Sequence, residues 1–352
     1  MNKKNVTFSD IAAYTNFSKT TISRYFNNPD SLTEENQKII ADALTALDYK
    51  ENKVARILAN GKTEFIGIII PSLFFRFFSE MLDKILGTYE TYGYKFLVFL
   101  GDEKKEAEEK YLQELLAYKI EGLIIMSHTI SSGELASYHV PVVAIEREAE
   151  HIFSVETDNY KGAFEAAQIL SEDGCQALFH INSFPDEQEP DYKRITGFCD
   201  CAQKSGLPYR VLRENFGFEY EDTHSKLKRM FEEIEKEYPD KRKGVFISND
   251  THANIFMNIV LRYGRRVPED YEIIGFDDSP ASREAIIPFT TVGQDTKRLA
   301  EAAMELLVRQ IEARKKRHAD QELQPEHRVV EPAVIRREST LNLVQHKTQE
   351  EK

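Results

Sequence analysis

The sequence predicts an α/β protein: a three-helix N-terminal headpiece followed by a core of two lobes, each a doubly wound α/β sheet. Three observations lead to this fold class. Residues 1–50 contain helical patterns with capping residues. From residue 65, short apolar runs alternate with helical segments, which is typical of buried parallel strands. This alternation occurs over 65–145 and again over 177–276, so we expect two lobes that enclose a cleft.

The composition predicts a cytoplasmic protein of more than one domain. The chain has 352 residues, of which 41% are hydrophobic, and this suits two or three compact units. No stretch approaches the ~18 consecutive apolar residues of a membrane span, and the first residues contain no apolar signal region. Cys175, Cys199 and Cys201 are too few for a disulfide framework and suit a reducing compartment.

Residues 7–27 have the pattern of a helix-turn-helix. Thr7 and Asp10 form a capping pair for a first helix, and Asn16 suits the left-handed turn that ends it. Ser18 then caps a second short helix. The outward face of this second helix carries hydrogen-bond donors: Lys19, Thr20, Ser23 and Arg24. The pattern predicts a recognition helix for the major groove of DNA, although an ordinary pair of capped helices would also fit.

The net charge of −13 is divided unevenly along the chain. Residues 1–62 hold nine Lys/Arg and seven Asp/Glu, a balance of +2, whereas the remainder holds 37 and 52, a balance of −15. Phosphates would repel the acidic core, and the headpiece is only mildly basic. We therefore expect modest non-specific DNA affinity, with selectivity left to base contacts and dimer geometry.

The order of motifs in the first sixty residues is specific. A third amphipathic helix, capped by Thr33, follows the helix-turn-helix. The motifs are Val6-Thr7, Asp10-Ile11-Ala12, Ser18, Thr21-Ile22-Ser23-Arg24, Asn27, Leu47, Tyr49, Asn52, Ala55 and Leu58. In this order they resemble the lactose/galactose repressor family of bacterial transcription regulators, and the resemblance continues to about Arg337. It implies a periplasmic-binding-protein-like core, a homodimer, and operator binding switched by a small molecule.

The resemblance also implies domain boundaries. The expected units are a headpiece (1–50), a hinge helix and linker (51–62), a bilobal effector-binding and dimerisation domain (63–340) and a polar tail (341–352). The N-lobe is expected to comprise about 63–157 and 290–320, and the C-lobe about 158–289 and 321–340. The chain would cross between lobes near 157, 290 and 320, before a last strand VVEPAVIRR. The tail lacks sustained heptads, so we expect a dimer without a tetramer-forming helix.

The family's DNA-contacting positions fall on residues of the headpiece and hinge. They are Thr7, Ser18, Lys19, Thr20, Thr21, Ser23, Arg24, Asn27, Tyr49, Asn52, Ala55 and Leu58. Arg24 is well suited to read guanine, and Leu58 matches a leucine that wedges into the minor groove. Glu51 stands where the family usually has proline, so a softer hinge is expected.

The resemblance further implies an effector site between the lobes. Its residues would be Phe75, Phe77, Phe78, Glu146, Arg194, Phe218, Asn249, Asp277 and Gln294, with weaker support for Phe216. Aromatic rings can cover the apolar face of a sugar while charged and amide groups bind its hydroxyls, so a sugar or sugar phosphate is expected. Phe77 and Phe78 would also fit plain core positions. Arg76 stands where proline is common, which leaves the shape of that rim open.

No catalytic group, cofactor or metal is expected. His180, His224 and His252 lack the spacing of a nucleophilic or metal site, and no Gly-rich phosphate loop precedes a helix. The sequence thus predicts a DNA-binding repressor of carbohydrate-utilisation genes, released from a palindromic operator by a small sugar. The alternatives are a regulator that needs a corepressor or an adaptor protein, a sugar-binding transport protein, and an enzyme.

Overall fold

The structure is a computed structural model, and it describes residues 6–50, 62–102, 104–147, 149–185, 189–315 and 323–341. It divides into two compact units, Met1–Lys62 and Thr63–Lys352. The predicted hinge contacts Asn52, Ala55 and Leu58 lie outside the described residues, as does all of the tail after Leu341. In the described part of the chain, no helix is both long and apolar enough to cross a membrane.

The headpiece contains the predicted helices. These are α1 (Phe8–Thr15), α2 (Lys19–Asn27), a short 3-10 helix η1 (Pro29–Ser31) and α3 (Glu34–Ala46). The capping pair is confirmed, since the Thr7 backbone N–H donates to Asp10 Oδ2 at 2.8 Å. Asn16 adopts the expected left-handed conformation with φ 59°. Ser18 Oγ accepts from the backbone N–H of Thr21 at 3.1 Å. The helices enclose a small core of Ile11, Ile22, Ile40 and Ala43.

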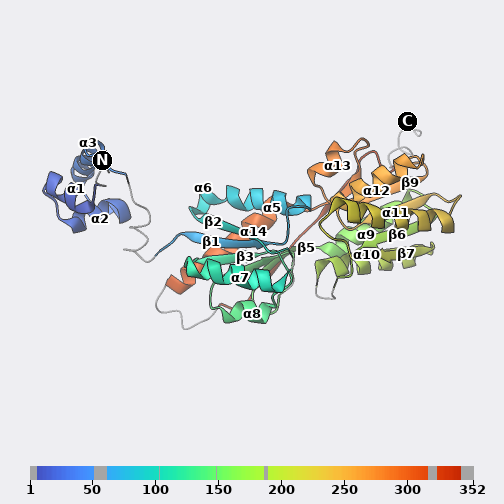
Figure 1. Cartoon of the computed structure of the whole chain (residues 1–352), viewed down its shortest axis with the longest axis horizontal. Coiled ribbons are helices and arrows are strands. Elements are labelled where there is room, and N and C mark those ends of the chain that lie inside the picture. The colour runs from blue at the N-terminus through green and yellow to red at the C-terminus, as the bar shows by residue number, and fades with distance from the viewer. Residues whose placement is uncertain are drawn as a thin grey trace, which may run out of the picture. The chain divides into compact units, whose positions relative to one another are not determined.

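The described part of the first lobe is a parallel sheet with helices on both faces. Its strands, in spatial order, are β11 (His327–Val330), β5 (Phe153–Thr157), β4 (Val142–Ile145), β3 (Gly122–Ile125), β1 (Phe65–Ile70) and β2 (Lys95–Leu100). One face is covered by α5 (Arg76–Gly87) and α14 (Thr296–Lys315), and the other by α7 (Lys105–Ala117) and α8 (Ser132–Ser137), while α6 (Tyr89–Tyr92) extends α5 (Figure 1). Side chains alternate along β1, so Ile68 packs beneath α5 and Ile69 beneath α7.

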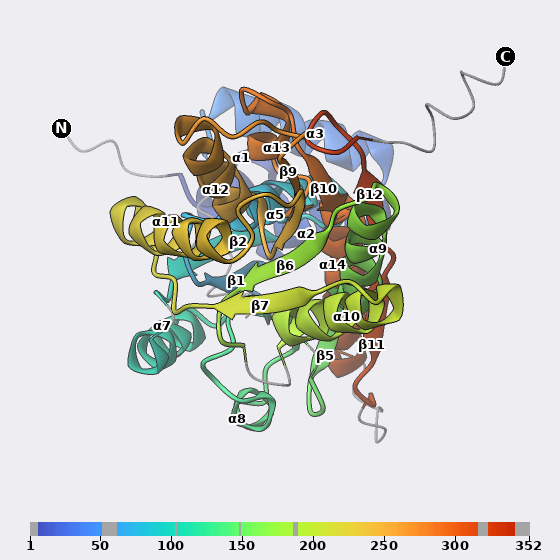
Figure 2. The same cartoon turned by 90° about the vertical axis from the view of Figure 1, so that its right-hand side faces the viewer.

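The second lobe repeats this strand order. Its sheet runs β12 (Ala333–Ile335), β10 (Thr290–Gly293), β9 (Tyr271–Asp277), β8 (Lys243–Ile247), β6 (Ala177–Asn182) and β7 (Tyr209–Arg213), with β12 antiparallel to β10. The helices α9 (Asn159–Glu172) and α10 (Pro190–Ser205) pack on one face, and α11 (Tyr220–Glu237) and α12 (Asp250–Arg262) on the other (Figure 2). A short helix, α13 (Pro280–Glu284), follows β9. The fold prediction is therefore confirmed for both lobes.

One glycine sets how closely α9 and α10 approach each other. A Cβ atom on Gly197 would lie 2.2 Å from the carbonyl oxygen of Tyr160, inside any real contact distance. Only glycine therefore allows α10 to pack against the backbone of α9 here. Because Arg194 lies on the same helix one turn earlier, this contact also sets where its side chain emerges.

One predicted lobe boundary is wrong and another lies a few residues later than expected. Thr290–Gly293 forms β10 of the second sheet, so the crossing predicted near 290 follows Gly293. The last crossing was predicted near 320, but His327–Val330 still pairs with β5 of the first sheet. The expected strand VVEPAVIRR is two short strands in different sheets. Pro332 lies between them, and because proline has no N–H to donate, it interrupts the ladder where the chain changes lobes.

Candidate functional site

The carboxyl ends of both sheets open onto one cleft. Residues 71–78 follow β1, Glu146 follows β4, and residues 183–184 and 189–191 follow β6. Asn249 comes after β8, while Gln294 comes after β10. Together these segments line a cavity of about 590 Å³. Ligands bind at this edge of open α/β sheets because loops from several strands converge there.

All nine residues predicted for the effector site line this cavity. They are Phe75, Phe77, Phe78, Glu146, Arg194, Phe218, Asn249, Asp277 and Gln294. Phe216, which had weaker support, also lines it. Phe77 is only 7% exposed and packs with Met81 and Ile85. Much of its ring therefore belongs to the hydrophobic core, the alternative given above for this residue.

Other residues of the lining were not predicted from the sequence. They are Pro71, Met126, His128, Thr129, Ser183, Phe184, Glu189, Pro190, Asp191, Asn215, Ser248 and His252. For two of them, the distance in sequence from a predicted residue could have indicated that they belong to the site. Asp191 lies three residues before Arg194 and pairs with it on one helix face, and His252 lies three residues after Asn249. The others depend on which strand ends become neighbours.

Arg194 makes several of the polar contacts in the cavity lining. Its Nε donates to Asn159 Oδ1 at 2.7 Å, and its Nη1 donates to the Ser248 carbonyl oxygen at 2.5 Å. Nη1 also lies 2.9 Å from Asp191 Oδ1. The guanidinium stacks 3.7 Å from the ring centre of Phe276. The side chain is thereby held in one orientation by three segments of the chain.

Glu146 faces this guanidinium from the first lobe. Its Oε1 accepts from the Thr157 backbone N–H at 2.7 Å, and its Oε2 accepts from Asn159 Nδ2 at 3.1 Å. Burial raises the pKa of the Glu146 carboxyl, and Arg194, 3.9 Å away, opposes that shift. Asn159, the first residue of α9, thus connects Glu146 of one lobe to Arg194 of the other.

A second polar chain crosses between the lobes through Gln294. Its Oε1 accepts from Thr157 Oγ1 at 2.6 Å, and its Nε2 donates to Asp277 Oδ1 at 2.8 Å. Asp277 has φ 117°, a conformation that side chains rarely adopt and that persists where the surroundings impose it. Burial, and then the nearby Asp250 carboxyl, raise the pKa of Asp277 well above its usual range.

Asp250 anchors the loop that carries Asp277. Its Oδ2 accepts from the Ser279 backbone N–H at 2.7 Å, and its Oδ1 accepts from Thr291 Oγ1 at 2.6 Å. Burial raises the pKa of Asp250 to about 7. Its role is to hold the ends of β9 and β10 together, since it does not line the cavity.

Aromatic side chains in the lining also join the lobes. The ring of Phe75, from the first lobe, lies 5.6 Å from Phe218 and 5.3 Å from His252, both from the second. The ring of Phe216 lies 4.5 Å from that of His252. Asn249 Nδ2 lies 3.1 Å from His252 Nδ1, so the imidazole proton is placed on Nε2. Burial lowers the pKa of His252 to about 3, which keeps the ring neutral.

On the first-lobe side of the cavity, the lining residues His128 and Thr129 adjoin a buried hydrogen-bonded group. The buried carboxylate of Glu108 accepts from the hydroxyls of Thr129 and Ser127, the latter at 2.5 Å. Arg147 Nη1 donates to the Ser127 carbonyl oxygen at 3.1 Å. Burial, and then Arg147, lower the pKa of His128 to about 4. Polar but uncharged groups therefore face the cavity here.

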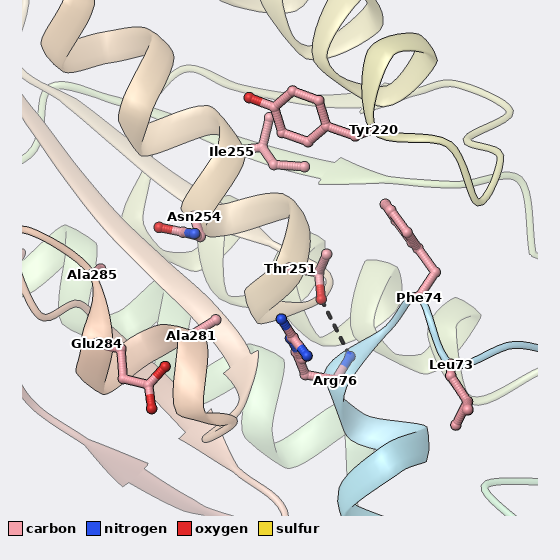
Figure 3. Close-up of a pocket in the computed structure, with 10 residues that line it drawn as sticks. All are labelled: Leu73, Phe74, Arg76, Tyr220, Thr251, Asn254, Ile255, Ala281, Glu284 and Ala285. Atoms are coloured by element: carbon pink, nitrogen blue, oxygen red, sulfur yellow. Dashed lines mark hydrogen bonds between the residues drawn. The ribbon is translucent and has the colours of Figure 1, made fainter.

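A second hollow of about 550 Å³ lies beside the cleft (Figure 3). Its residues come from the segment that leads into α5, from the first residue of α11 (Tyr220), and from α12 and the α13 region. The backbone N–H of Arg76 donates to Thr251 Oγ1 at 3.4 Å. None of the nine predicted residues lines it. The described residues also contain no group of three or more His, Cys, Asp or Glu side chains placed to hold a metal. The cleft is therefore the candidate site.

The headpiece presents most of its predicted contacts on its surface. Ser18, Lys19, Thr20, Arg24 and Asn27 are exposed, as is Thr7, whereas Thr21 and Ser23 are half-buried. Thr21 Oγ1 lies 2.9 Å from Ser18 Oγ, and Asn27 Nδ2 donates to Ser23 Oγ at 3.1 Å. The ring of Tyr49 packs 5.8 Å from Phe26, so it also supports the core.

Comparison with known proteins agrees with this architecture. The model of a periplasmic binding protein-like domain matches residues 167–340. The ribose operon repressor of Halalkalibacterium halodurans is 30% identical over 307 residues, which cover 87% of this chain and 90% of that protein. The chain belongs to the lactose/galactose repressor family of bacterial transcription regulators.

Solved structures of this family share the fold. A periplasmic binding protein/LacI transcriptional regulator from Alkaliphilus metalliredigens, complexed with D-xylulofuranose, is 28% identical with a TM-score of 0.69, covering 79% of this chain and 100% of that one. The lac repressor dimer bound to operator has a TM-score of 0.79 at 20% identity, covering 96% of this chain and 100% of that one. These relatives are transcription regulators and not enzymes.

Proposed function

We propose that this regulator is a cytoplasmic homodimeric repressor of carbohydrate-utilisation genes, released from a palindromic operator by a small sugar in the interlobe cleft. The observation that carries the proposal is the composition of the cleft. Arg194, Asn249 and Asp277 offer donors and acceptors in the lining, while Phe75 and Phe218 pack together as an aromatic surface in the same lining. Hydroxyls on the edge of a sugar ring and the apolar face of that ring match these two surfaces.

The headpiece supplies the DNA contacts in this proposal. Arg24, Lys19 and Thr20 are exposed on α2 and read base edges in the major groove, while Ser18 and the residues around it hold phosphates. Asn52, Ala55 and Leu58 form the hinge contacts, with Leu58 in the minor groove. A ligand that prefers one relative position of the lobes shifts the dimer toward the state with lower operator affinity.

Two relatives suggest which sugars to test first. One is a ribose operon repressor and another was crystallised with D-xylulofuranose. The operator is first selected from a random double-stranded DNA library with the full-length protein. Fluorescence anisotropy then measures operator affinity during titration with D-ribose and D-xylulose, followed by a wider panel of mono- and disaccharides. We expect at least one sugar to weaken operator binding about tenfold or more, which corresponds to an ordinary allosteric coupling energy.

The outcomes separate this proposal from its alternatives. Enrichment of no sequence from the library would refute operator recognition. A sugar that tightens operator binding would replace induction with corepression. A sugar that is chemically altered during incubation would indicate an enzyme, and we expect it to be recovered unchanged.

A further inference from the structure

The charges that line the cleft are mostly negative. Among the described residues of the lining, the carboxyl groups are Glu146, Glu189, Asp191 and Asp277, and the only guanidinium or ammonium group is Arg194. Burial favours the neutral acids of Glu146 and Asp277. Even with both of these protonated, Glu189 and Asp191 outnumber the single cation.

The single cation is already engaged. Arg194 donates to Asn159 and to the Ser248 carbonyl oxygen, and Asp191 neutralises it at 2.9 Å. Its flat face lies against Phe276. An anionic ligand that uses Nη1 would have to compete with Asp191, which lies three residues before Arg194 on the first turn of α10.

Other basic side chains nearby do not make the balance positive, although Arg147 interacts electrostatically with the Glu189 carboxyl from outside the lining. His128 and His252 line the cleft, but their pKa values are lowered to about 4 and about 3, so both rings are neutral at physiological pH. Arg147 and Arg213 are not part of the lining. Arg147 donates to the Ser127 carbonyl oxygen, and the Arg213 guanidinium lies over the ring of Phe184 at 5.5 Å.

We propose that the cleft selects an uncharged or amine-bearing polyhydroxylated ligand and excludes phosphate esters of the same sugars. The inference rests on the proposed function, because it concerns the ligand of the same cleft. A phosphate needs cationic or N–H partners when it loses water, and an unpartnered buried charge is strongly unfavourable. An ammonium group, in contrast, would meet carboxylates. The balance of −15 over residues 63–352 adds to the repulsion of anions as they approach.

Paired ligands test the inference on the full-length protein. Isothermal titration calorimetry measures the dissociation constants of D-ribose, D-xylulose and D-glucose and of their esters D-ribose 5-phosphate, D-xylulose 5-phosphate and D-glucose 6-phosphate. A second comparison sets D-glucosamine against D-glucose. We expect each phosphate ester to bind at least about 100-fold more weakly than the free sugar that binds, and D-glucosamine to bind no more weakly than D-glucose. A phosphate ester that binds as tightly as its free sugar overturns the inference.

A charge-removing variant with a matched control locates the cause. Asp191→Asn removes the carboxylate beside Arg194. It should reduce the ratio between the dissociation constants of the phosphate ester and the free sugar about tenfold. Asp200→Asn removes the same charge from the same helix. The Asp200 carboxylate is exposed and accepts from the Tyr160 hydroxyl at 2.8 Å, so the ratio of the two dissociation constants should equal that of the parent protein. An equal ratio of ester to sugar dissociation constants in the two variants would mean that Asp191 does not select against anions.

These results are separable from those that test the repressor proposal. A response of operator binding to a sugar phosphate, but not to the free sugar, overturns this inference and leaves the repressor function standing. Free sugars that bind in the cleft without changing operator affinity support this inference and refute induction. Binding by neither series refutes both the sugar cleft and its charge preference.

Discussion

Replacing Arg194 with alanine should uncouple the effector response from DNA binding and also destabilise the core. The guanidinium is buried, and its removal leaves Asn159 Oδ1 and the Ser248 carbonyl oxygen without the donors they have at 2.7 and 2.5 Å. Each unsatisfied buried acceptor costs about 1–3 kcal/mol. The 3.9 Å pair with Glu146 adds little, because burial favours the neutral form of that carboxyl. We therefore expect a loss of about 3 kcal/mol in the free energy of unfolding.

Urea denaturation followed by circular dichroism measures this loss, since the chain has no tryptophan to report by fluorescence. With an m-value of about 3 kcal/mol/M, the midpoint of the core transition should fall by about 1 M. Arg210→Ala is the control. Arg210 pairs on the surface with Glu233 and Glu237, and exposed pairs contribute about 0–1 kcal/mol.

The same two variants separate structure from function. Without effector, both should bind the operator with parental affinity, because the headpiece is a separate compact unit. Only Arg194→Ala should lose the response to the sugar that releases the parent protein. Equal urea midpoints for the two variants would refute the energetic role of the buried contacts. An unchanged sugar response would refute the place of Arg194 in the cleft.

Four further changes have defined outcomes. Asp277→Ala should abolish the sugar response and keep operator binding in anisotropy titrations; an unchanged midpoint would remove Asp277 from the site. Gly197→Ala places a Cβ 2.2 Å from the Tyr160 carbonyl oxygen, so it should cost about 1–3 kcal/mol in urea denaturation and weaken sugar binding in calorimetry. The folded pKa of Asp250 is about 7, above its unfolded value of 3.8, so the unfolded state loses this proton first and stability falls as pH rises through this range. Asp250→Asn should flatten that fall in denaturation curves between pH 4.5 and 7.5, and parallel curves would contradict the assignment. Arg24→Ala should cost about 1–3 kcal/mol on the selected operator and relax one base preference, whereas equal losses on random DNA would indicate a phosphate contact.

Local sequence determined the headpiece because its structure depends on neighbours along the chain. Ser18 and Thr33 accept from backbone N–H groups three residues further on, and Asp10 accepts from the backbone N–H of Thr7. Asn16 adopts the left-handed turn that its residue type tolerates. The alternation of apolar runs and helices likewise predicted both parallel sheets, since buried strands are apolar on both faces.

The order of motifs determined the core of the ligand cleft. All nine residues chosen on that basis line one cavity, although they come from seven separate segments between Phe75 and Gln294. Periodicity alone would not have joined them. A doubly wound topology brings the carboxyl ends of its strands to one edge, so residues that follow different strands become neighbours once the strand order is known.

Only the tertiary structure decided where the chain changes lobes and which partners hold the site. Val330 and Ala333 are both small apolar residues of one expected strand, yet Val330 ends a strand of one sheet and Ala333 begins a strand of the other. The reason is that strand pairing depends on segments at least 40 residues away. The partners of Arg194 have the same origin. Asn159 and the Ser248 carbonyl oxygen lie 35 and 54 residues from it in the chain. A local pattern predicts the residues that make an element, but the contacts between distant elements arise only when their buried faces pack together.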